Sequence, residues 1–538
     1  MLGATRAFAG IRRRSAKHEA TSPDSFSLML IAAWPERYVT TSIIPKEVDS
    51  NPNVEQHSDT AEITSQISIC NNPAIPLELE VRPSTVVVAV VEYVSPIRRL
   101  SVRRLVVLAL AIVLPAAGCG VNNNAQDAFR RDSVVTVSIW HPWGGTQKEK
   151  FDRVVQEFNR THPRIKVKSL FTPNDLSNNQ KFFTAVAAAK PPDIVFVDGQ
   201  QTAAWAEQGA LEPLDGFLAK DGIKREDYFP PCWNQNEYDG HVWALTYCAD
   251  PNFAFVWNKK VFREVGLDPE KPPTTIEELD RYNDLITKKS GAKITRMGII
   301  PWAQYGSANS IFTWGWAFGG EFYDPKTRKV TADHPRVVKA LEWMVSYAKR
   351  YDVTRVNAFA SGFGSREQNP LYIGQVAMQC LHISGIEEIK QYAPNLEYGV
   401  GYIPAPPDGE QHSSWVGGWC LAIPKGCRHP EAAWEFIKWA CRNPKGTLAA
   451  GRIQGLFPGH RKSPYFDAIR NKPGYGQFLR IMEECRHQRP VMPAQAFYMS
   501  ALNRAVEYAI YGRMTPREAL KQAARETQAE LDLRLAGR

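Results

Sequence analysis

The chain has 538 residues, of which 44% are apolar and 22% are charged, and it carries a net charge of +9. The length predicts two or three domains, and the composition excludes both a wholly disordered chain and a polytopic membrane protein. The 65 basic residues are offset by 56 acidic ones and are too dilute for the clustered basic surface that nucleic-acid binding needs. The 15 tryptophans indicate a large core or a site that stacks flat apolar faces.

The first part of the chain resembles an export signal more than a domain. Residues 1–97 show no sustained helical or strand period, so we expect a non-native or disordered extension. Arginines precede the apolar run LVVLALAIVLPAAG at 105–118, which is shorter than the roughly 20 residues of a membrane-spanning helix. We therefore predict a lipoprotein signal peptide over 98–118. Ala116-Ala117-Gly118-Cys119 resembles a lipobox, which implies acylation of Cys119 and a polar tether over 119–133.

The position of this signal is unusual, because an export signal has to lie at the N-terminus of the chain. We therefore expect translation to start near Val94, Leu100 or Val102, which bacterial alternative start codons could encode. The alternative is a buried apolar helix. It is disfavoured because the run is apolar on all sides and is flanked by arginines.

Strands and helices alternate from residue 134 onward. The alternation of VVTVSIW predicts a strand over 134–140, and Phe151, Val154, Val155 and Phe158 form one stripe of a helix within 147–160. The pattern continues with a strand, a helix and a strand over 165–170, 182–189 and 191–199. This β-α-β-α-β order predicts a parallel sheet with helical crossovers.

Further helices are marked by capping residues and apolar stripes. Thr275 and Glu278 form a capping box, and Thr515 with Glu518 predicts the start of a last helix that ends near residue 535. Two more helical stripes are Val338, Leu341, Val345 and Ala348, and Ala433, Phe436, Ile437 and Ala440. Tryptophans at helical spacing are expected to pack in the core: Trp316, Trp343, Trp434 and Trp439.

Motifs for catalysis or cofactor binding are absent from the sequence. It contains no P-loop, no dinucleotide-binding glycine motif, no nucleophile elbow and no H-E-x-x-H pair, so we expect no enzyme activity, cofactor or metal. The nine cysteines include no C-x-x-C pair and are expected to be buried hydrophobes. A disulfide between Cys232 and Cys248 stays open, because spacing alone does not decide it.

The order of motifs from residue 134 to the end resembles the extracellular solute-binding proteins of ATP-driven importers. The resemblance is to the large carbohydrate-type family that includes maltodextrin- and glycerol-phosphate-binding proteins. The longest matching stretch is YDGHVWALTYCADPNFAFVWNKKVFREVGLDPEKPPTTIEELD. The other segments that carry it are SIWHPW, FNRTHPRIKV, KFFTAVAAAKPPDIVFVD, IGQVAMQC, GVGYIPAPPDG, WVGGWCLAIPKG, HPEAAWEFIKWACRNP and GRMTPREALKQAARETQAEL.

The resemblance implies an α/β fold of the two-lobed periplasmic-binding-protein type II, each lobe a mainly parallel sheet flanked by helices. Hinge crossings are expected near Tyr247–Val256 and Gly399–Pro406. Lobe 1 would comprise 134–248 and 403–456, and lobe 2 would comprise 249–402 and 457–538. The ligand would bind in the cleft between the lobes, which would close over it.

The expected ligand contacts follow from sugar chemistry and from the resemblance. Aromatic faces stack on sugar C–H patches and polar side chains bind the hydroxyls, at loops that follow the carboxyl ends of strands. The loop rule selects His141, Trp143, Gly144, Asp198, Gly199, Gln200 and Trp302. Family loops imply Gly417, Gly418, Trp419 and Tyr498 as well.

The resemblance implies a membrane-anchored, extracytoplasmic receptor, monomeric, that delivers a sugar to the permease subunits of an ABC transporter. A long maltodextrin is not expected, because Ile311 stands where a stacking tyrosine can occur, and His382 and Ser384 replace another aromatic. A glycerol-phosphate ligand is the alternative, although no arginine can be assigned to a phosphate. A secreted carbohydrate-active enzyme with the same tryptophan-lined cleft is the third hypothesis.

Overall fold

The computed structural model describes residues 30–34, 37–41, 134–173, 176–364 and 366–536. Contacts divide the chain into two units, residues 1–114 and 115–538. In the first unit, β1 (Leu30–Trp34) and β2 (Arg37–Thr41) pair antiparallel, where the sequence predicted no regular element. The predicted extension, signal peptide, Cys119 and tether otherwise lie outside the described residues.

A six-stranded sheet forms the core of lobe 1 in the second unit, in the order β17-β8-β16-β5-β3-β4. Its strands are β3 (Val135–His141), β4 (Ile165–Phe171), β5 (Ile194–Asp198), β8 (Leu245–Asn252), β16 (Trp415–Ala422) and β17 (Phe457–Pro458). The predicted parallel arrangement of β3, β4 and β5 is confirmed. The other pairs are antiparallel, so the sheet is mixed rather than mainly parallel.

Helices cover both faces of this sheet. The predicted stripe is confirmed in α2 (Gly145–Thr161), whose residues Phe151, Val154, Val155 and Phe158 are buried. It packs in one core with α13 (Pro430–Cys441) and α14 (Pro444–Gln454), including the expected Trp434 and Trp439. A separate cluster joins β5 and β16 to α3 (Leu176–Ala187) and α4 (Thr202–Glu207). The predicted helix over 182–189 ends earlier, because Ala189 has a left-handed φ of 52°.

Shorter elements complete lobe 1. They are η1 (Gly199–Gln201), α5 (Asp215–Asp221), η2 (Arg225–Asp227), α6 (Pro230–Asn234), β6 (Glu237–Tyr238), β7 (His241–Val242) and α15 (Tyr465–Ile469). Just after the expected boundary at residue 456, β17 pairs with β8 of the lobe 1 sheet.

Lobe 2 contains a three-stranded sheet in the order β14-β9-β15. Both β14 (Met378–Leu381) and β15 (Tyr398–Gly401) pair antiparallel with β9 (Ala254–Asn258), so the prediction of a mainly parallel sheet is wrong here. β9 carries the chain away from lobe 1, and β14 and β15 come before the chain returns to it. Both therefore run in the direction opposite to β9, one on each side of it. Two small antiparallel pairs are β10 (Lys288–Ser290) with β11 (Lys293–Arg296), and β12 (Tyr323–Asp324) with β13 (Lys329–Val330).

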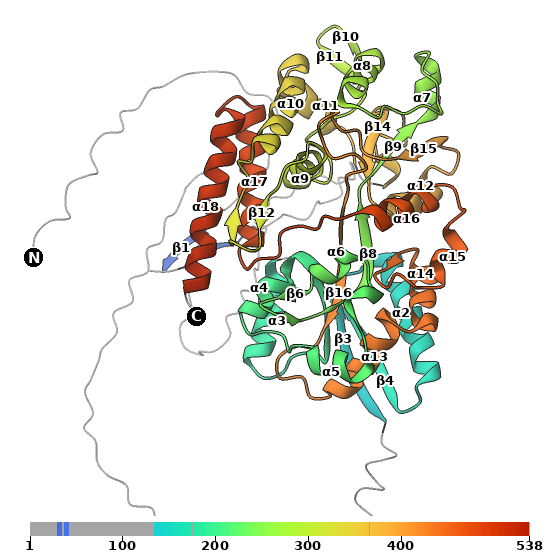
Figure 1. Cartoon of the computed structure of the whole chain (residues 1–538), viewed down its shortest axis with the longest axis vertical. Coiled ribbons are helices and arrows are strands. Elements are labelled where there is room, and N and C mark those ends of the chain that lie inside the picture. Colours follow the sequence, from blue (N-terminus) through green and yellow to red (C-terminus); the bar gives the residue numbers. More distant parts are fainter. Residues whose placement is uncertain (1–29, 35–36, 42–133, 174–175, 365, 537–538) are drawn as a thin grey trace, which may run out of the picture. The chain divides into compact units, whose positions relative to one another are not determined.

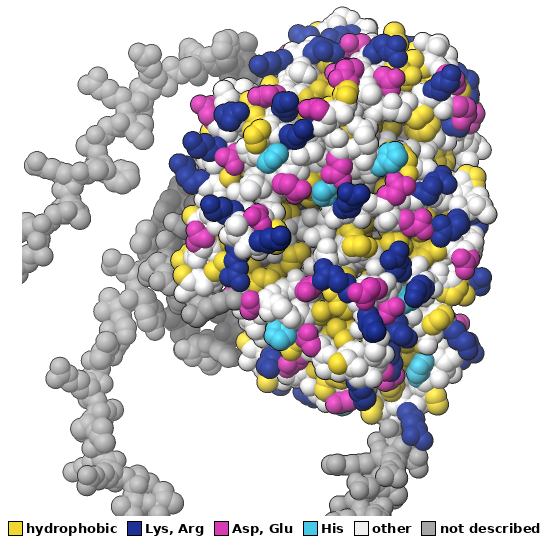
Figure 2. Space-filling view, in the orientation of Figure 1, with side chains coloured by type: hydrophobic (Ala, Val, Ile, Leu, Met, Phe, Trp, Pro, Cys, Tyr) yellow, Lys and Arg dark blue, Asp and Glu magenta, His cyan; other side chains and the backbone are white. Residues whose placement is uncertain are grey.

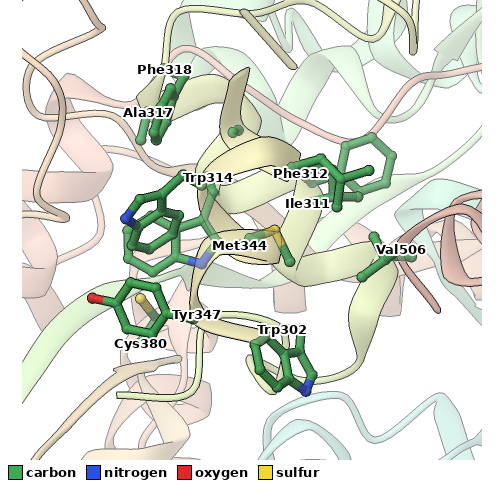
Figure 3. Close-up of a cluster of buried hydrophobic side chains, with 14 of the residues drawn as sticks. Trp302, Ile311, Phe312, Trp314, Ala317, Phe318, Met344, Tyr347, Cys380 and Val506 are labelled. Carbon is green, nitrogen blue, oxygen red and sulfur yellow. The ribbon is translucent and has the colours of Figure 1, made fainter. Parts of the chain in front are cut away.

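The largest core cluster belongs to lobe 2 and is rich in aromatic side chains (Figure 3). Trp314 at its centre is fully buried, and Trp316 and Trp343 are buried as predicted. The lobe 2 helices include α7 (Lys259–Glu264), α8 (Ile276–Ile286), α9 (Ser307–Ala317), α10 (Pro335–Tyr351), α11 (Val353–Ala360), η3 (Arg366–Gln368), α12 (Ser384–Tyr392), α17 (Gln495–Ile510) and α18 (Pro516–Ala536). A further helix, α16 (Tyr475–Glu484), lies between the lobes and contacts β8 as well as β9 and β15. Figure 1 shows α17 and α18 side by side.

The capping predictions hold at the level of single hydrogen bonds. The Glu278 backbone N–H donates to Thr275 Oγ1 (3.1 Å), and the Glu278 carboxylate accepts from the Thr275 backbone N–H in return. The same exchange links Thr515 and Glu518 at the start of α18. These helix ends are set by local sequence, which is why the sequence alone located them.

The chain crosses between the two sheets three times. It first passes from β8 to β9 at Phe253, within the expected stretch, and it returns through residues 402–414 (Figure 1). A third crossing, residues 485–494, leads from α16 to α17 and was not predicted. The crossings are bound to one another, because the Val416 N–H donates to the His487 carbonyl (2.9 Å) and the Cys485 thiol contacts the Ser414 carbonyl (3.0 Å).

Charges and thiols give a consistent picture of the surface and the interior. Figure 2 shows lysines and arginines interspersed with acidic residues over the visible face. All seven cysteines that the structure describes are free, so the open question of a Cys232–Cys248 disulfide is answered against it. Within the described part of the chain, none of the helices is both long and apolar enough to cross a bilayer.

Gly418 in β16 is required by the backbone around it. Its φ is +142°, and a Cβ atom there would lie 2.1 Å from the Cys248 carbonyl oxygen of β8. We expect Gly418→Ala to lower the free energy of unfolding by about 3 kcal/mol in urea titrations, because strain and overlap act together. The control is Gly216→Ala on α5, where a Cβ meets nothing within 4 Å. Equal stability of the two variants would contradict this reading of Gly418.

Candidate functional site

A cavity of about 390 Å³ lies between the two lobes. Lobe 1 contributes the loop after β3 and the first turns of α2, together with β8 and β16, and lobe 2 contributes α12. Its lining residues are Trp143, Thr146, Gln147, Lys150, Cys248, Asp250, Ser384, Glu387, Glu388, Lys390, Gln391, Trp419 and Leu456. We call this cavity the cleft. It occupies the place where the carboxyl end of β3 meets the other lobe, as expected for ligand sites of open α/β sheets.

Two tryptophans of lobe 1 present partly exposed rings to the cleft. Trp143 follows β3 and packs against Phe196 (ring centroids 4.6 Å apart) and Phe151 (5.1 Å), which hold one side of the indole. Trp419 on β16 is also half-buried and packs on the same core. Both were predicted as ligand contacts, and the structure places them in one cavity. Such supported aromatic faces suit flat apolar patches of a ligand.

A carboxylate stands at the point where the first crossing begins. Asp250 lies near the end of β8, is partly exposed at the cleft wall, and accepts no hydrogen bond from any described residue. Burial and then the nearby Asp198 raise the pKa of Asp250 to about 7, and Arg489 opposes this shift. Asp250 therefore changes charge near neutral pH, with a carboxyl group directed at the cavity.

Asp198 is held by an ion pair rather than left open to ligand. Its Oδ1 atom lies 3.3 Å from Nη2 of Arg489, and both side chains are largely buried. The Arg489 guanidinium also lies over the Trp415 ring, 5.1 Å from the centroid. Asp198 accepts a 2.6 Å hydrogen bond from the Gln200 amide as well. The predicted site residues Asp198 and Gln200 are thus adjacent, and they join β5 to the third crossing.

Several amide oxygens around the site have no donor. Among the described residues, no hydrogen bond reaches the buried Oε1 atoms of Gln147, Gln200 and Gln201. Leaving a buried acceptor without a partner costs about 1–3 kcal/mol. Gln147 lines the cleft, and Gln200 and Gln201 follow β5 at the same edge of the sheet. Acceptors in this arrangement fit a ligand that brings hydroxyl donors.

Tyr305 supplies an exposed aromatic ring from lobe 2. It is 45% exposed and stacks on Phe253 of the first crossing, with ring centroids 5.4 Å apart. Its edge contacts His382 (4.4 Å), whose Nδ1 is hydrogen-bonded to Ser384 at the start of α12. Burial lowers the pKa of His382 to about 4, so this imidazole is neutral at physiological pH.

Three predicted site residues are buried in cores instead of facing the cleft. His141 is 1% exposed, packs on the Phe151 ring (4.8 Å), and has its pKa lowered to about 4 by burial. Trp302 lies in the lobe 2 core (Figure 3), where its indole N–H donates to Asn357 (3.0 Å). Tyr498 is fully buried and donates to the Phe322 carbonyl (2.9 Å). These three predictions of ligand contact are corrected, because apolar neighbours cover the side chains.

The predicted glycines have backbone roles. Gly144 is exposed and caps the start of α2 beside the cleft. Gly199 is buried against the Gln235 side chain, and Gly418 approaches β8 as described above. A Cβ on Gly417 would lie 3.1 Å from Nη2 of Arg489, so the absence of a side chain leaves room for the ion pair.

Sequence reasoning missed Asp250, Tyr305 and Arg489. Asp250 had a signal, because it is an acidic residue within the otherwise apolar stretch ALTYCADPNFAFVW, and such residues are frequently functional. Arg489 and Tyr305 had no such signal, because their positions depend on the third crossing and on the contact with Phe253. In the described residues, no group of three or more metal-binding side chains occurs.

Comparisons with known proteins place the chain in a family. Residues 144–444 match the family described as bacterial extracellular solute-binding protein. The maltotriose-binding protein of Pyrococcus abyssi (strain GE5 / Orsay) is 25% identical over 356 residues, which are 64% of this chain and 71% of that protein. The sn-glycerol-3-phosphate-binding periplasmic protein UgpB of Escherichia coli (strain K12) is 25% identical over 318 residues, 58% of this chain and 69% of that protein.

A solved structure extends the comparison to a larger share of the chain. The protein CpMnBP1 with mannobiose bound is 29% identical and has a TM-score of 0.65, over 73% of this chain and 99% of that chain.

The raised pKa of Asp250 predicts a pH-dependent stability. Because the folded state binds this proton more tightly than the unfolded state, its contribution to stability is lost as pH rises from about 4 to about 7. We expect Asp250→Asn to raise the Tm at pH 8 by about 3 °C relative to the unmodified protein, with little effect at pH 4. Asp467→Asn on α15, which is exposed, serves as the control in thermal unfolding. A Tm difference that does not change with pH would contradict the assignment.

Proposed function

The chain belongs to the bacterial extracellular solute-binding proteins, and on that premise we propose that it captures a neutral oligosaccharide in the cleft for an ABC importer. The observation that carries this proposal is the composition of the cleft. Two supported tryptophan faces stand in a cavity with the Asp250 carboxyl group and the Gln147 amide, whose buried Oε1 atom has no donor among the described residues. Sugars present the complementary surface, with flat C–H patches and hydroxyl donors at the rim.

The balance of charge supports a neutral rather than an anionic ligand. The cleft lining holds two lysines and three carboxylates: Lys150, Lys390, Asp250, Glu387 and Glu388. The nearby Arg489 is engaged by Asp198. A phosphate dianion in this cavity would face carboxylates at short range with little basic charge left to bind it.

A glycerol-phosphate ligand remains the second candidate, on one specific observation. Among the described residues, the Lys150 ammonium has no ion-pair partner, so it is available to an anion. The relationship to the glycerol-phosphate-binding protein of E. coli supports the same candidate. Binding of glycerol 3-phosphate and loss of that binding in Lys150→Met would favour it.

We propose that the protein works by closing its lobes over the solute. The two sheets are joined by three adjacent crossings, which is the arrangement in which a few residues can absorb a hinge rotation. The ligand would bridge Trp143 and Trp419 on lobe 1 with α12 on lobe 2, and so stabilise the closed state. The closed form would then be delivered to the permease. The named relatives are binding proteins, and we propose the same role here, without chemistry on the ligand.

The first test is a titration of the protein with sugars, followed by intrinsic tryptophan fluorescence. We expect saturable binding of oligosaccharides and no binding of glycerol 3-phosphate. Trp143→Ala should weaken the affinity by at least about tenfold, because one supported stacking face is lost. Trp243→Ala, a half-buried tryptophan outside the cleft lining, should leave affinity unchanged.

Each other outcome of the titration has a defined meaning. A response to glycerol 3-phosphate alone would replace the proposal by the second candidate. Release of shorter sugars during the titration, abolished by Asp250→Asn, would support the enzyme hypothesis instead. Thermal unfolding of each variant checks that the change in affinity does not come from loss of the fold.

We also propose that Cys119 is acylated and anchors the protein outside the cytoplasm. This proposal rests on the arginine-flanked apolar run that ends at Ala116-Ala117-Gly118. In bacteria fed a labelled fatty acid, we expect label on the protein and none on Cys119→Ser. Label that persists in that variant would refute acylation at this position. Cys427→Ser is the control for loss of a thiol elsewhere.

A further inference from the structure

A second hollow lies within lobe 2, next to the cleft. Its volume is about 370 Å³, and it is lined by Ile300, Ala303, Gln304, Tyr305, Ala360, Phe363, Gly364, Asn369, Pro370, Val376, Gln379, His382 and Glu388. We call it the side pocket. Its lining residues belong to lobe 2 alone, so it exists independently of lobe closure. Nothing in the proposal for the cleft uses it.

The side pocket adjoins the cleft through shared residues. Glu388 on α12 lines both cavities. Ser384 lines the cleft and is hydrogen-bonded to His382, which lines the side pocket. The first half of α12 is therefore a wall that the two cavities have in common.

The chemistry of the side pocket repeats that of the cleft. Tyr305 and Phe363 supply aromatic faces, with the Phe363 ring supported edge-on by Phe359 (4.8 Å). Among the described residues, the buried Oε1 atom of Gln379 has no hydrogen-bond donor. The Glu388 carboxylate is contacted by the Tyr372 hydroxyl at 3.3 Å. Aromatic faces and open acceptors thus occur together for a second time in adjoining space.

A packing defect would have a different composition. Cavities that are merely voids are apolar, whereas this one combines a solvent-exposed tyrosine with a buried amide oxygen that lacks a donor. A hydroxyl from a ligand would satisfy that oxygen and recover the cost of its burial. The volume lies at the lower end of the range for ligand pockets, which leaves room for a further sugar unit beside those in the cleft.

We propose that the side pocket binds one sugar unit of the ligand beyond those held between Trp143 and Trp419. This inference rests on the proposed sugar-binding function and assigns it a second compartment. The extra ring stacks on Tyr305 or Phe363 and donates a hydroxyl to Gln379. Lobe 2 then distinguishes ligands by their length. A shorter sugar fills the cleft without reaching the side pocket, whereas a longer one occupies both.

The test is to fill the entrance and compare ligands that differ by one unit. Ala303 is exposed at the rim, so Ala303→Phe occupies the side pocket without disturbing the core. The probes are mannose and glucose oligosaccharides of two, three and four units, measured by isothermal titration calorimetry. In the unmodified protein, at one point in the mannose or the glucose series, the oligosaccharide that is longer by one unit should bind about tenfold more tightly than the shorter one. We call this increase the step. In Ala303→Phe that step should disappear, with the affinity for the shorter sugar unchanged.

Two further variants keep the result specific. Gln379→Leu removes the open acceptor and should reduce the same step by about fivefold. Ala496→Phe makes the identical chemical change at an exposed alanine of α17 that lines neither the cleft nor the side pocket, and should change nothing. Circular dichroism checks that all three variants are folded.

The outcomes separate this inference from the proposed function. If no oligosaccharide binds the unmodified protein, the proposed sugar-binding function is wrong, and so is the proposal that the side pocket binds a sugar unit. If oligosaccharides bind but no step occurs, or if the step persists in Ala303→Phe, the function stands and the side pocket proposal is overturned. A complex in which the bound trisaccharide stays clear of Phe363 would overturn it as well.

Discussion

The ion pair between Asp198 and Arg489 is the contact around which the site is organised. Asp198 ends β5 in lobe 1, and Arg489 lies on the third crossing, so the pair fixes that crossing above the sheet. Trp415 beneath the guanidinium and the side-chain-free Gly417 beside it make the space for this contact. The pair also engages the positive charge of Arg489 near the cleft, while its carboxylate helps to keep the proton on Asp250.

This arrangement explains why the site has many acceptors and few free cations. The side-chain amide of Gln200 donates to Asp198. The Oε1 atom of Gln200 is thereby turned toward space where the described residues offer no hydrogen-bond donor. Asp250 lines the cleft from β8. Under the proposed function, a ligand would be selected by the hydrogen atoms it can donate more than by its charge. The aromatic rings add affinity without distinguishing one hydroxyl pattern from another.

Features that depend on neighbouring residues could be predicted from the sequence. Features that depend on contacts between distant segments of the chain could not. The stripe of α2 and the box at Thr275 and Glu278 were predictable, because helix period and capping act within a few residues. The antiparallel pairing of β16 with β8 was not, because it joins segments far apart in the chain. In the site, Trp143 was found by its place after a strand. Tyr498 was misassigned, because apolar neighbours in lobe 2, unseen in the sequence, bury it completely.

The free thiols of the second unit have a consequence for where and when the protein can fold. Its seven described cysteines form no disulfide, and burial raises the pKa of thiols such as Cys380 and Cys420, which keeps them protonated and slow to oxidise. Folding of this unit therefore requires neither an oxidant nor an isomerase. Six of these cysteines are buried and Cys427 is partly exposed, so a thiol reagent that reacts with the buried six reports on molecules that have opened.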